Sequence, residues 1–167
     1  KTRGRCVLSL PAQKGSHCMT ACRAGKVLLR DAAATAQAGA SFATKLGKGN
    51  VVFMNGPVGA GKSVFVRGLV RRLLGEEDAV VPSPTYLLEQ EYGPVVLGTD
   101  KCTVRHFDLY RLHGKLSATD WEAFGWDRVL FRDLCIMEWP QCARDLILKA
   151  RPAHQQIWEV SLELADP

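Results

Sequence analysis

One stretch of the sequence constrains the fold of this chain more than any other, the eight residues GPVGAGKS at positions 56–63. They fit the pattern G-x-x-x-x-G-K-S/T, follow the short apolar run 51–55 and precede residues 63–75, whose apolar positions recur at helical spacing. Glycines let the backbone turn so that successive N–H groups face one anion, and the following helix offers its positive end to the same point. The motif therefore predicts a strand, a phosphate-binding loop and a helix in that order.

This loop predicts which residues hold a nucleotide. Lys62 would reach the β- and γ-phosphates, and Ser63 would place its hydroxyl on Mg²⁺. The alternative is a glycine-rich turn that binds nothing. Hydrolysis is a separate question, because the loop alone does not polarise an attacking water molecule. The residues of this segment that we expect to bind ATP or ADP are Gly56, Pro57, Val58, Gly59, Ala60, Gly61, Lys62, Ser63 and Val64.

Strand-like and helical segments alternate along the rest of the chain. We expect strands at 26–30, 51–55, 86–92, 103–110, 134–138 and 157–164, and helices at 32–49, 63–75, 117–125 and 142–150. The turn and capping signals are Asp31, Gly47 and Gly49 for the first helix, Gly93, Pro94 and Gly98 for the loop of an antiparallel pair, and Thr119 with Glu122 for a capping box. The pattern predicts an α/β chain, a three-layer fold of the P-loop NTPase type around a small mixed parallel and antiparallel sheet.

Two acidic residues lie in strand-like runs, and an open α/β sheet places its ligands at the carboxyl ends of its strands. Glu138 ends the run 134–138, where it is suited to ordering Mg²⁺ or to acting as a base on the nucleophile. Asp108 lies between two apolar residues, and a carboxylate there needs a metal, a cation or donors as partners. The alternatives are a solvated glutamate and an aspartate paired with Arg105 or Arg111. We expect the catalytic residues to be Glu138, Asp108 and Lys62, and the metal ligands to be Ser63, Glu138 and Asp108.

Three further residues are candidates for the site. The loop PSPT, residues 82–85, offers the hydroxyl of Thr85 to Mg²⁺ or to the γ-phosphate, and the alternative is a rigid turn into the next strand. Trp139 directly follows Glu138, where an aromatic ring would cover the nucleotide, anchor a partner or pack in the core. For His106 a surface or hydrogen-bonded role is favoured over one that faces the nucleotide.

The net charge of +5 comes from the first part of the chain. Seven of the 22 basic residues lie within residues 1–30, which contain no acidic residue, so the remainder carries 15 basic and 17 acidic residues. That balance gives no reason to expect extensive contact with nucleic acid. We expect residues 1–25 to be a basic leader, disordered or similar to an organelle transit peptide, and residues 26–167 to be a P-loop ATPase domain. The expected location is the cytoplasm, or an organelle matrix or stroma if the leader is a targeting signal. Since the chain begins with Lys1 rather than Met, we expect it to be a fragment at this end.

The composition also argues against two classes of protein. No run approaches the roughly 20 apolar residues of a membrane span, so we expect no contact with a membrane. The six cysteines show no C-x-x-C pair and no regular spacing, which argues against a zinc site or a disulfide scaffold.

Four blocks of the sequence, taken in order, resemble the TsaE family, also called YjeE: GPVGAGKSVFVRGLVRRL, VPSPTYLLEQEY, HFDLYRL and CIMEWP. The resemblance spans about residues 26–164 and is specific, since the S-P-T, H-F-D-L-Y-R and E-W-P blocks are not general P-loop features. TsaE proteins are small P-loop ATPases of bacterial-type threonylcarbamoyladenosine modification of tRNA. This chain departs from bacterial members in its leader, in a somewhat long hairpin loop and in lacking a closing strand after residue 164.

The resemblance implies an accessory ATPase that is weak alone and activated by partners. Members of the family act with a TsaD-type transferase and its TsaB-type partner, which attach the threonylcarbamoyl group to adenosine 37 of tRNA. The chain would then meet tRNA indirectly, through this complex. By motif match, Lys62 and Ser63 are the phosphate and Mg²⁺ residues, Thr85 belongs to a switch loop, Asp108 and Glu138 matter for hydrolysis, and Trp139 lies near the nucleotide.

Two other functions use the same loop. A small-molecule P-loop kinase would need an Arg-rich lid to clamp the transferred phosphate, whereas Arg67, Arg71 and Arg72 lie in the helix after the loop. A nucleotide-dependent docking module, in which hydrolysis is incidental, would share every residue with the favoured interpretation.

Overall fold

The structure is a computed structural model that describes residues 6–10, 25–112, 114 and 116–165. Within this part of the chain the strands are β1 (Cys6–Leu10), β2 (Gly25–Leu29), β3 (Val51–Asn55), β4 (Glu89–Leu97), β5 (Asp100–Asp108), β6 (Leu134–Glu138) and β7 (Ile157–Leu164). The helices are α1 (Ala32–Ala43), α2 (Lys62–Leu74), α3 (Ala118–Ala123), α4 (Trp126–Val129) and α5 (Arg144–Ala150), with a 3₁₀ turn at Pro140–Cys142.

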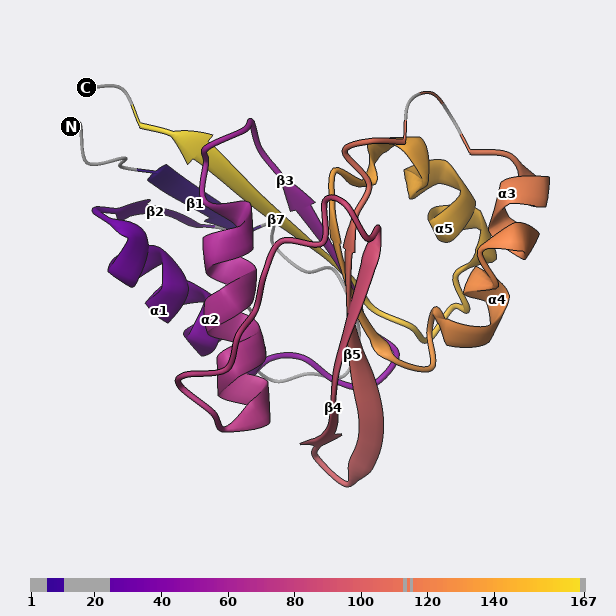
Figure 1. The fold of residues 1–167 in the computed structure, drawn as a ribbon, viewed down its shortest axis with the longest axis horizontal. Coiled ribbons are helices and arrows are strands. Elements are labelled where there is room, and N and C mark those ends of the chain that lie inside the picture. Colours follow the sequence, from indigo (N-terminus) through magenta and orange to yellow (C-terminus); the bar gives the residue numbers. More distant parts are fainter. Residues whose placement is uncertain (1–5, 11–24, 113, 115, 166–167) are drawn as a thin grey trace.

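The described strands form one mixed sheet in the order β2-β1-β7-β3-β6-β5-β4. The four central strands, β7, β3, β6 and β5, run parallel to one another. β4 pairs antiparallel with β5, and β1 pairs antiparallel with both β7 and β2. Figure 1 shows α1 and α2 on one face of this sheet and α3, α4 and α5 on the other. The three-layer α/β fold with a mixed sheet is therefore confirmed.

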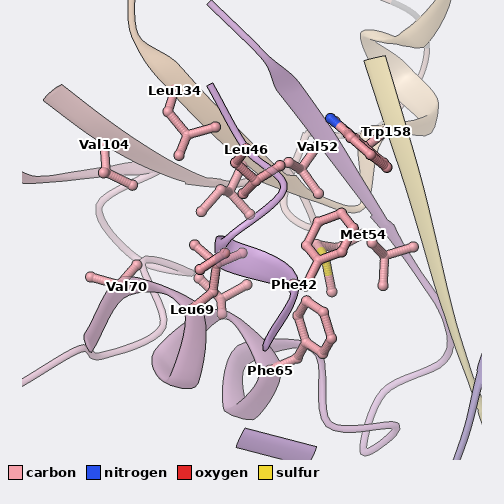
Figure 2. Packing of buried hydrophobic residues seen from close by; sticks show 14 of the residues in the cluster. Phe42, Leu46, Val52, Met54, Phe65, Leu69, Val70, Val104, Leu134 and Trp158 are labelled. Atoms are coloured by element: carbon pink, nitrogen blue, oxygen red, sulfur yellow. The ribbon is translucent and has the colours of Figure 1, made fainter. Parts of the chain in front are cut away.

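The central strands are buried on both faces, as expected for parallel strands covered by helices. Val52 and Met54 of β3 face the α1 and α2 side, and Phe53 faces the α3 to α5 side. In the first of these layers, Figure 2 shows the ring of Phe42 from α1 close to the ring of Phe65 from α2, with their centroids 5.8 Å apart. Continuous apolar runs such as VVFMN are thus explained by two cores, one on each side of the sheet.

Helices α1 and α2 pack backbone to backbone because each has a glycine where the two helices meet. A Cβ added to Gly39 of α1 would lie 2.0 Å from the carbonyl oxygen of Phe65, and one added to Gly68 of α2 would lie 1.9 Å from that of Ala36. Only a hydrogen fits in either place. This contact holds α2, and with it the loop that precedes α2, against α1.

The helix ends agree with the sequence at some points and differ at others. Asp31 caps α1 as expected, accepting a hydrogen bond from the Ala34 N–H at 2.8 Å. However, α1 ends at Ala43 rather than near Gly47, because the next N–H groups turn back to carbonyls three residues earlier. The expected capping box at Thr119 and Glu122 is wrong, since the box in front of α3 is formed by Ser117 and Asp120.

The antiparallel pair of strands is present, but its boundaries differ from the expected ones. β4 begins at Glu89 rather than at residue 86, because the N–H groups of Leu87 and Leu88 both bind the carbonyl of Pro84 and turn the chain. Gly93 and Pro94 are not in the loop: they lie inside β4, where the register with β5 shifts, and the reversal occurs at Gly98. A proline on an edge strand at a bulge removes no ladder bond that the sheet needs.

The expected leader also differs from the structure in one place. Residues 6–10, which the sequence assigned to the leader, form β1 between β2 and β7 in the sheet, and Leu8 is buried in the core. Residues 1–5 and 11–24, where the rest of the expected leader falls, lie outside the described residues. Across the described ranges, none of the helices combines the length and apolar character needed to span a bilayer.

Candidate functional site

The site forms where the carboxyl ends of β3, β5 and β6 meet at one edge of the sheet. The parallel registers place Glu138, the last residue of β6, beside Met54 of β3 and beside Asp108 of β5. One residue after Met54, β3 ends and the chain enters the loop that leads into α2. The two acidic residues predicted from the sequence therefore lie next to each other and opposite the start of α2.

The loop 56–61 depends on glycine at two positions. Gly56 has φ of 142°, and a Cβ there would lie 2.2 Å from the carbonyl oxygen of Leu162 on β7, so the backbone can pass the sheet only without a side chain. Gly61 has φ of 94° and is the N-cap of α2. Because Gly61 has no side chain to cap the helix, the first N–H groups of α2 are left for another acceptor, which is the arrangement that binds phosphate.

The Lys62 side chain is almost fully buried at the floor of this loop. Its ammonium donates hydrogen bonds to the carbonyl oxygens of Gly56 and Pro57, at 2.8 and 2.9 Å. Burial lowers the pKa of Lys62, while the negative charges of Glu138 and Asp108 act in the opposite direction. The ammonium is thus held by loop carbonyls that an incoming phosphate group can replace.

Glu138 is buried and is held through both of its carboxylate oxygens. Ser63, one residue into α2, donates from its hydroxyl to Oε2 of Glu138 at 3.1 Å. On the other side, Nε2 of His106 lies 2.9 Å from Oε1, and His106 is completely buried. The glutamate is therefore a fixed part of the site and not a solvated residue at the end of a strand.

Asp108 is held by donors from the loop that precedes β4. The hydroxyl of Thr85 donates to Oδ2 of Asp108 at 2.5 Å, and the hydroxyl of Ser83 donates to the same oxygen at 3.2 Å. The N–H of Tyr110 donates to the other oxygen, Oδ1, at 3.0 Å. These contacts tie the PSPT loop to the sheet directly beside Glu138.

The arginines that could have paired with Asp108 are engaged elsewhere. Arg111 stacks over the ring of Tyr86, with 5.3 Å from its guanidinium carbon to the ring centroid. The side chain of Arg105 is only 15% exposed and forms a cluster with two carboxylates of β4 and one from the residue just before β6. The members of this Arg105 cluster are Arg105, Glu89, Glu91 and Asp133.

Trp139 forms the aromatic wall of the site in a strained backbone conformation. Its φ and ψ are 57° and 53°, the left-handed region, and it precedes Pro140, which disfavours helical conformations of either hand at the residue before it. The indole ring lies 3.9 Å from the ammonium of Lys62 and 5.0 Å, between centroids, from the ring of Tyr110. Strain of this kind is retained where the surrounding structure requires a particular orientation, as at ligand sites.

These groups surround a cleft of about 400 Å³. The residues that line it are Val58, Gly59, Gly61, Lys62, Ser63, Val64, Ser83, Thr85, Asp108, Tyr110, Glu138 and Trp139. Ten of them belong to the residues expected from the sequence. The other three expected residues, Gly56, Pro57 and Ala60, shape the loop from behind: the first two through their carbonyls and Ala60 through the core.

The sequence did not single out Ser83 and Tyr110, and for His106 it predicted a surface or hydrogen-bonded role, of which the hydrogen-bonded one is confirmed. Ser83 lies in the same PSPT loop as Thr85, two positions earlier. His106 and Tyr110 lie two residues before and after Asp108, so the alternation of side chains along a strand was the signal that could have found them. His106 shares the face of Asp108 and reaches Glu138 without lining the cleft.

A comparison of the sequence with models of protein families identifies the family of this chain. Residues 29–165 match the model described as "Threonylcarbamoyl adenosine biosynthesis protein TsaE". The chain belongs to the TsaE family. The match runs from the last residue of β2 to just beyond β7 and contains the loop, the PSPT segment and both acidic residues.

Curated relatives carry the same description. The chain is 31% identical over 125 residues to "tRNA threonylcarbamoyladenosine biosynthesis protein TsaE" of Rickettsia felis, a match that covers 75% of this chain and 64% of the relative. It is 32% identical over 126 residues to the protein of that name from Rickettsia bellii, which covers 75% and 77%. The protein of that name from Mycobacterium leprae is 32% identical over 120 residues, covering 70% and 72%. The chain thus spans a little under two thirds of the Rickettsia felis TsaE and more than two thirds of the other two.

A solved structure supports the fold of this TsaE chain. The structure described as "Crystal structure of Bacillus subtilus YdiB" superposes with a TM-score of 0.55 and 20% sequence identity, covering 82% of this chain and 74% of that one. At this identity the likeness concerns the arrangement of the sheet and helices alone.

Proposed function

We propose that the chain binds ATP in the cleft and hydrolyses it, and that hydrolysis supports repeated turnover of a threonylcarbamoyladenosine-forming complex. The observation that carries this proposal is the convergence of four segments on one cleft. The phosphate loop brings Lys62 and Ser63, the PSPT loop brings Thr85, and the ends of β5 and β6 bring Asp108 and Glu138. A site that only bound a phosphate would not need two buried carboxylates beside the helix N-terminus.

The oxygen donors present fit a magnesium ion. Mg²⁺ usually binds proteins through one or two oxygen ligands and takes its remaining ligands from water and substrate phosphates. Within the described residues no group of three or more His, Cys, Asp or Glu could hold a metal. Ser63 and Glu138, which already share a hydrogen bond, would hold the ion, with Asp108 close by; the ion supplies positive charge against the phosphates.

The side chains would then act as follows. Lys62 exchanges its two loop carbonyls for phosphate oxygens, so the ammonium has oxygen acceptors in both states. Glu138 orients the attacking water or accepts its proton. Asp108 holds the PSPT loop through Thr85 and Ser83, and the Thr85 hydroxyl would turn from Asp108 towards the terminal phosphate when ATP binds. Trp139 covers the nucleotide beside Lys62.

The proposed partners are a TsaD-type transferase and a TsaB-type protein, with tRNA reached through their complex. Apolar side chains exposed on both loops beside the cleft offer a surface on which another protein could dock. Val58 in the phosphate loop is 68% exposed, and Tyr86 and Leu87, which follow Thr85, are 87% and 69% exposed. A partner that binds there would contact both loops that surround the nucleotide.

ATP hydrolysis by the full chain, alone and after addition of a TsaB-type and TsaD-type pair from the same source, tests this proposal. We expect a slow basal rate that the pair raises, and we expect Glu138→Ala to lower the stimulated rate by about 100-fold or more, since a positioned base contributes typically 10²–10⁴-fold. Calorimetry should show that Glu138→Ala still binds ATP.

The matched control is Glu77→Ala, which removes an exposed carboxylate away from the cleft and should keep the full rate. A pair that neither binds the chain nor changes its rate would contradict the proposed partnership. If Glu138→Ala supports as many rounds of tRNA modification as the unaltered chain, nucleotide-dependent docking replaces hydrolysis as the function. Rapid phosphate transfer to a metabolite would instead show a kinase.

A further inference from the structure

We propose that His106 is a positioning residue, which donates a hydrogen bond from Nε2 to Glu138 and so fixes the carboxylate in the orientation that presents its second oxygen to Ser63. This inference rests on the proposed function, because the role of Glu138 in hydrolysis belongs to that proposal. His106 itself does not line the cleft and would act only through Glu138.

The registers of β5 and β6 place the two side chains on the same face of the sheet. His106 pairs with Ile136, and Asp108, two residues further along β5, pairs with Glu138. Because side chains alternate between faces along a strand, His106, Asp108 and Glu138 all project towards α2. The imidazole therefore lies two residues back along the strands from the carboxylates, between the apolar core and the cleft.

The contact is short, buried and directed. Nε2 of His106 lies 2.9 Å from Oε1 of Glu138, and the two residues are 0% and 2% exposed. The other oxygen, Oε2, is 3.1 Å from the hydroxyl of Ser63. One carboxylate oxygen is thus assigned to the histidine, which leaves the other for the residues that face the nucleotide.

The second ring nitrogen indicates which way the hydrogen bond runs. Among the described residues, Nδ1 of His106 is buried without a hydrogen-bond partner. An ionised carboxylate only accepts hydrogen bonds, so Nε2 carries the hydrogen and donates it to Oε1 of Glu138. This direction of the hydrogen bond is assigned from the partners of the two ring nitrogens.

Without this hydrogen bond, Glu138 has a competing partner nearby. The ammonium of Lys62 is close enough for the charge of Glu138 to raise its pKa, against the effect of burial. A glutamate released from His106 could swing towards Lys62, and the resulting ion pair would compete with the phosphate for the ammonium. Residues that hold a ligand or base from behind typically affect activity or metal affinity by 10–100-fold.

Two substitutions of His106 in the full chain separate positioning from packing. His106→Met fills similar space but has no donor, whereas His106→Gln keeps a side-chain N–H at about the reach of Nε2. We expect His106→Met to lower kcat for ATP hydrolysis by about 10- to 100-fold with KM changed by less than about threefold, and His106→Gln to recover most of the loss. Val104→Ala is the matched control, since Val104 is equally buried on β5 and belongs to the apolar cluster.

Val104→Ala should lower the melting temperature yet keep kcat within about threefold of the unaltered chain. The inference is overturned if His106→Met retains the full kcat or if His106→Gln loses as much kcat as His106→Met. It is also overturned if Val104→Ala, with the same melting temperature as His106→Met, loses as much kcat as His106→Met.

A second measurement keeps the inference separate from the proposed function. If the unaltered chain hydrolyses no ATP even with its partners, the proposed function fails, and ADP binding measured by calorimetry with and without Mg²⁺ decides the role of His106. We expect Mg²⁺ to tighten ADP binding to the unaltered chain and to His106→Gln, and to tighten it about tenfold less for His106→Met. An equal gain in His106→Met would show that Glu138 keeps its orientation without the histidine.

Discussion

Replacing Gly68 by alanine tests the close contact between α1 and α2, which sets the position of the helix that follows the phosphate loop. The new Cβ would lie 1.9 Å from the carbonyl oxygen, 2.6 Å from the carbonyl carbon and 2.8 Å from the Cα of Ala36. All three are backbone atoms of α1, so no rotamer change relieves the conflict and the helices must separate.

The magnitude follows from two opposing contributions. Overpacking a close-packed core costs about 1–3 kcal/mol, and a backbone conflict belongs at the upper end. Alanine in place of glycine in a helix returns about 1 kcal/mol of helix propensity. We therefore expect Gly68→Ala to lower the free energy of unfolding by about 2 kcal/mol, which for a chain of this size lowers the melting temperature by about 6 °C.

Urea unfolding followed by circular dichroism measures this change. Gly47→Ala is the control, because its Cβ would meet only the side chain of Asn50, at 3.9 Å, and should alter stability by less than about 0.5 kcal/mol. Combining Gly68→Ala with Gly39→Ala should cost less than the sum of the two, since one separation of the helices relieves both conflicts. A Gly68→Ala chain as stable as the original would refute the close approach of α1 and α2.

Three further predictions concern the site and the sheet. Binding of ATP should change the fluorescence of Trp139 as Lys62 leaves its ring, and Trp139→Phe should lose the signal while still binding ATP in calorimetry. Arg105→Met should destabilise the chain by about 2 kcal/mol, between the values for buried and exposed ion pairs, and high salt should restore part of the loss in urea unfolding. Hydrogen bonds from Ser117 lower the pKa of Asp120 from its ordinary value of 3.8. The stability that these bonds provide is therefore present above pH 3.8 and is lost as the pH falls through the lowered pKa of the folded state. Ser117→Ala, which removes the bond from the hydroxyl, should weaken this dependence of the melting temperature on acid.

Local patterns explain why much of the fold was predictable. The buried strands β3 and β6 and the ends of α2 follow from contiguous signals, an apolar run of the right length and a glycine at Gly75 that adopts the left-handed conformation. The boundaries of β4 were not predictable in this way. The residues YLL are apolar enough for a strand. However, the carbonyl of Pro84 accepts hydrogen bonds from the N–H groups of Leu87 and Leu88, so these groups cannot pair with a neighbouring strand.

Strand β1 shows a different limit. Its sequence, CVLSL, lies in a basic stretch whose composition suggests a leader, and five residues with no local partner carry little evidence of a strand. Residues 6–10 form a strand because β2 and β7 pair with them on either side, and these two partners come together only in the assembled sheet.

By itself the sequence determined the strand, loop and helix around residues 56–63, because a G-x-x-x-x-G-K-S motif between an apolar strand and a helix has few other physical solutions. It also determined the family, because the S-P-T, H-F-D-L-Y-R and E-W-P blocks follow that motif in order. The tertiary structure alone decided what holds the two acids in place. Asp108 and Glu138 are 30 residues apart in the chain, and the partners that each of them meets depend on how the strands pair. The parallel register of β5 and β6 brings His106 to Glu138, and the antiparallel pairing of β4 with β5 brings the PSPT loop, which precedes β4, to Asp108. The spacing of these residues along the chain indicates neither contact.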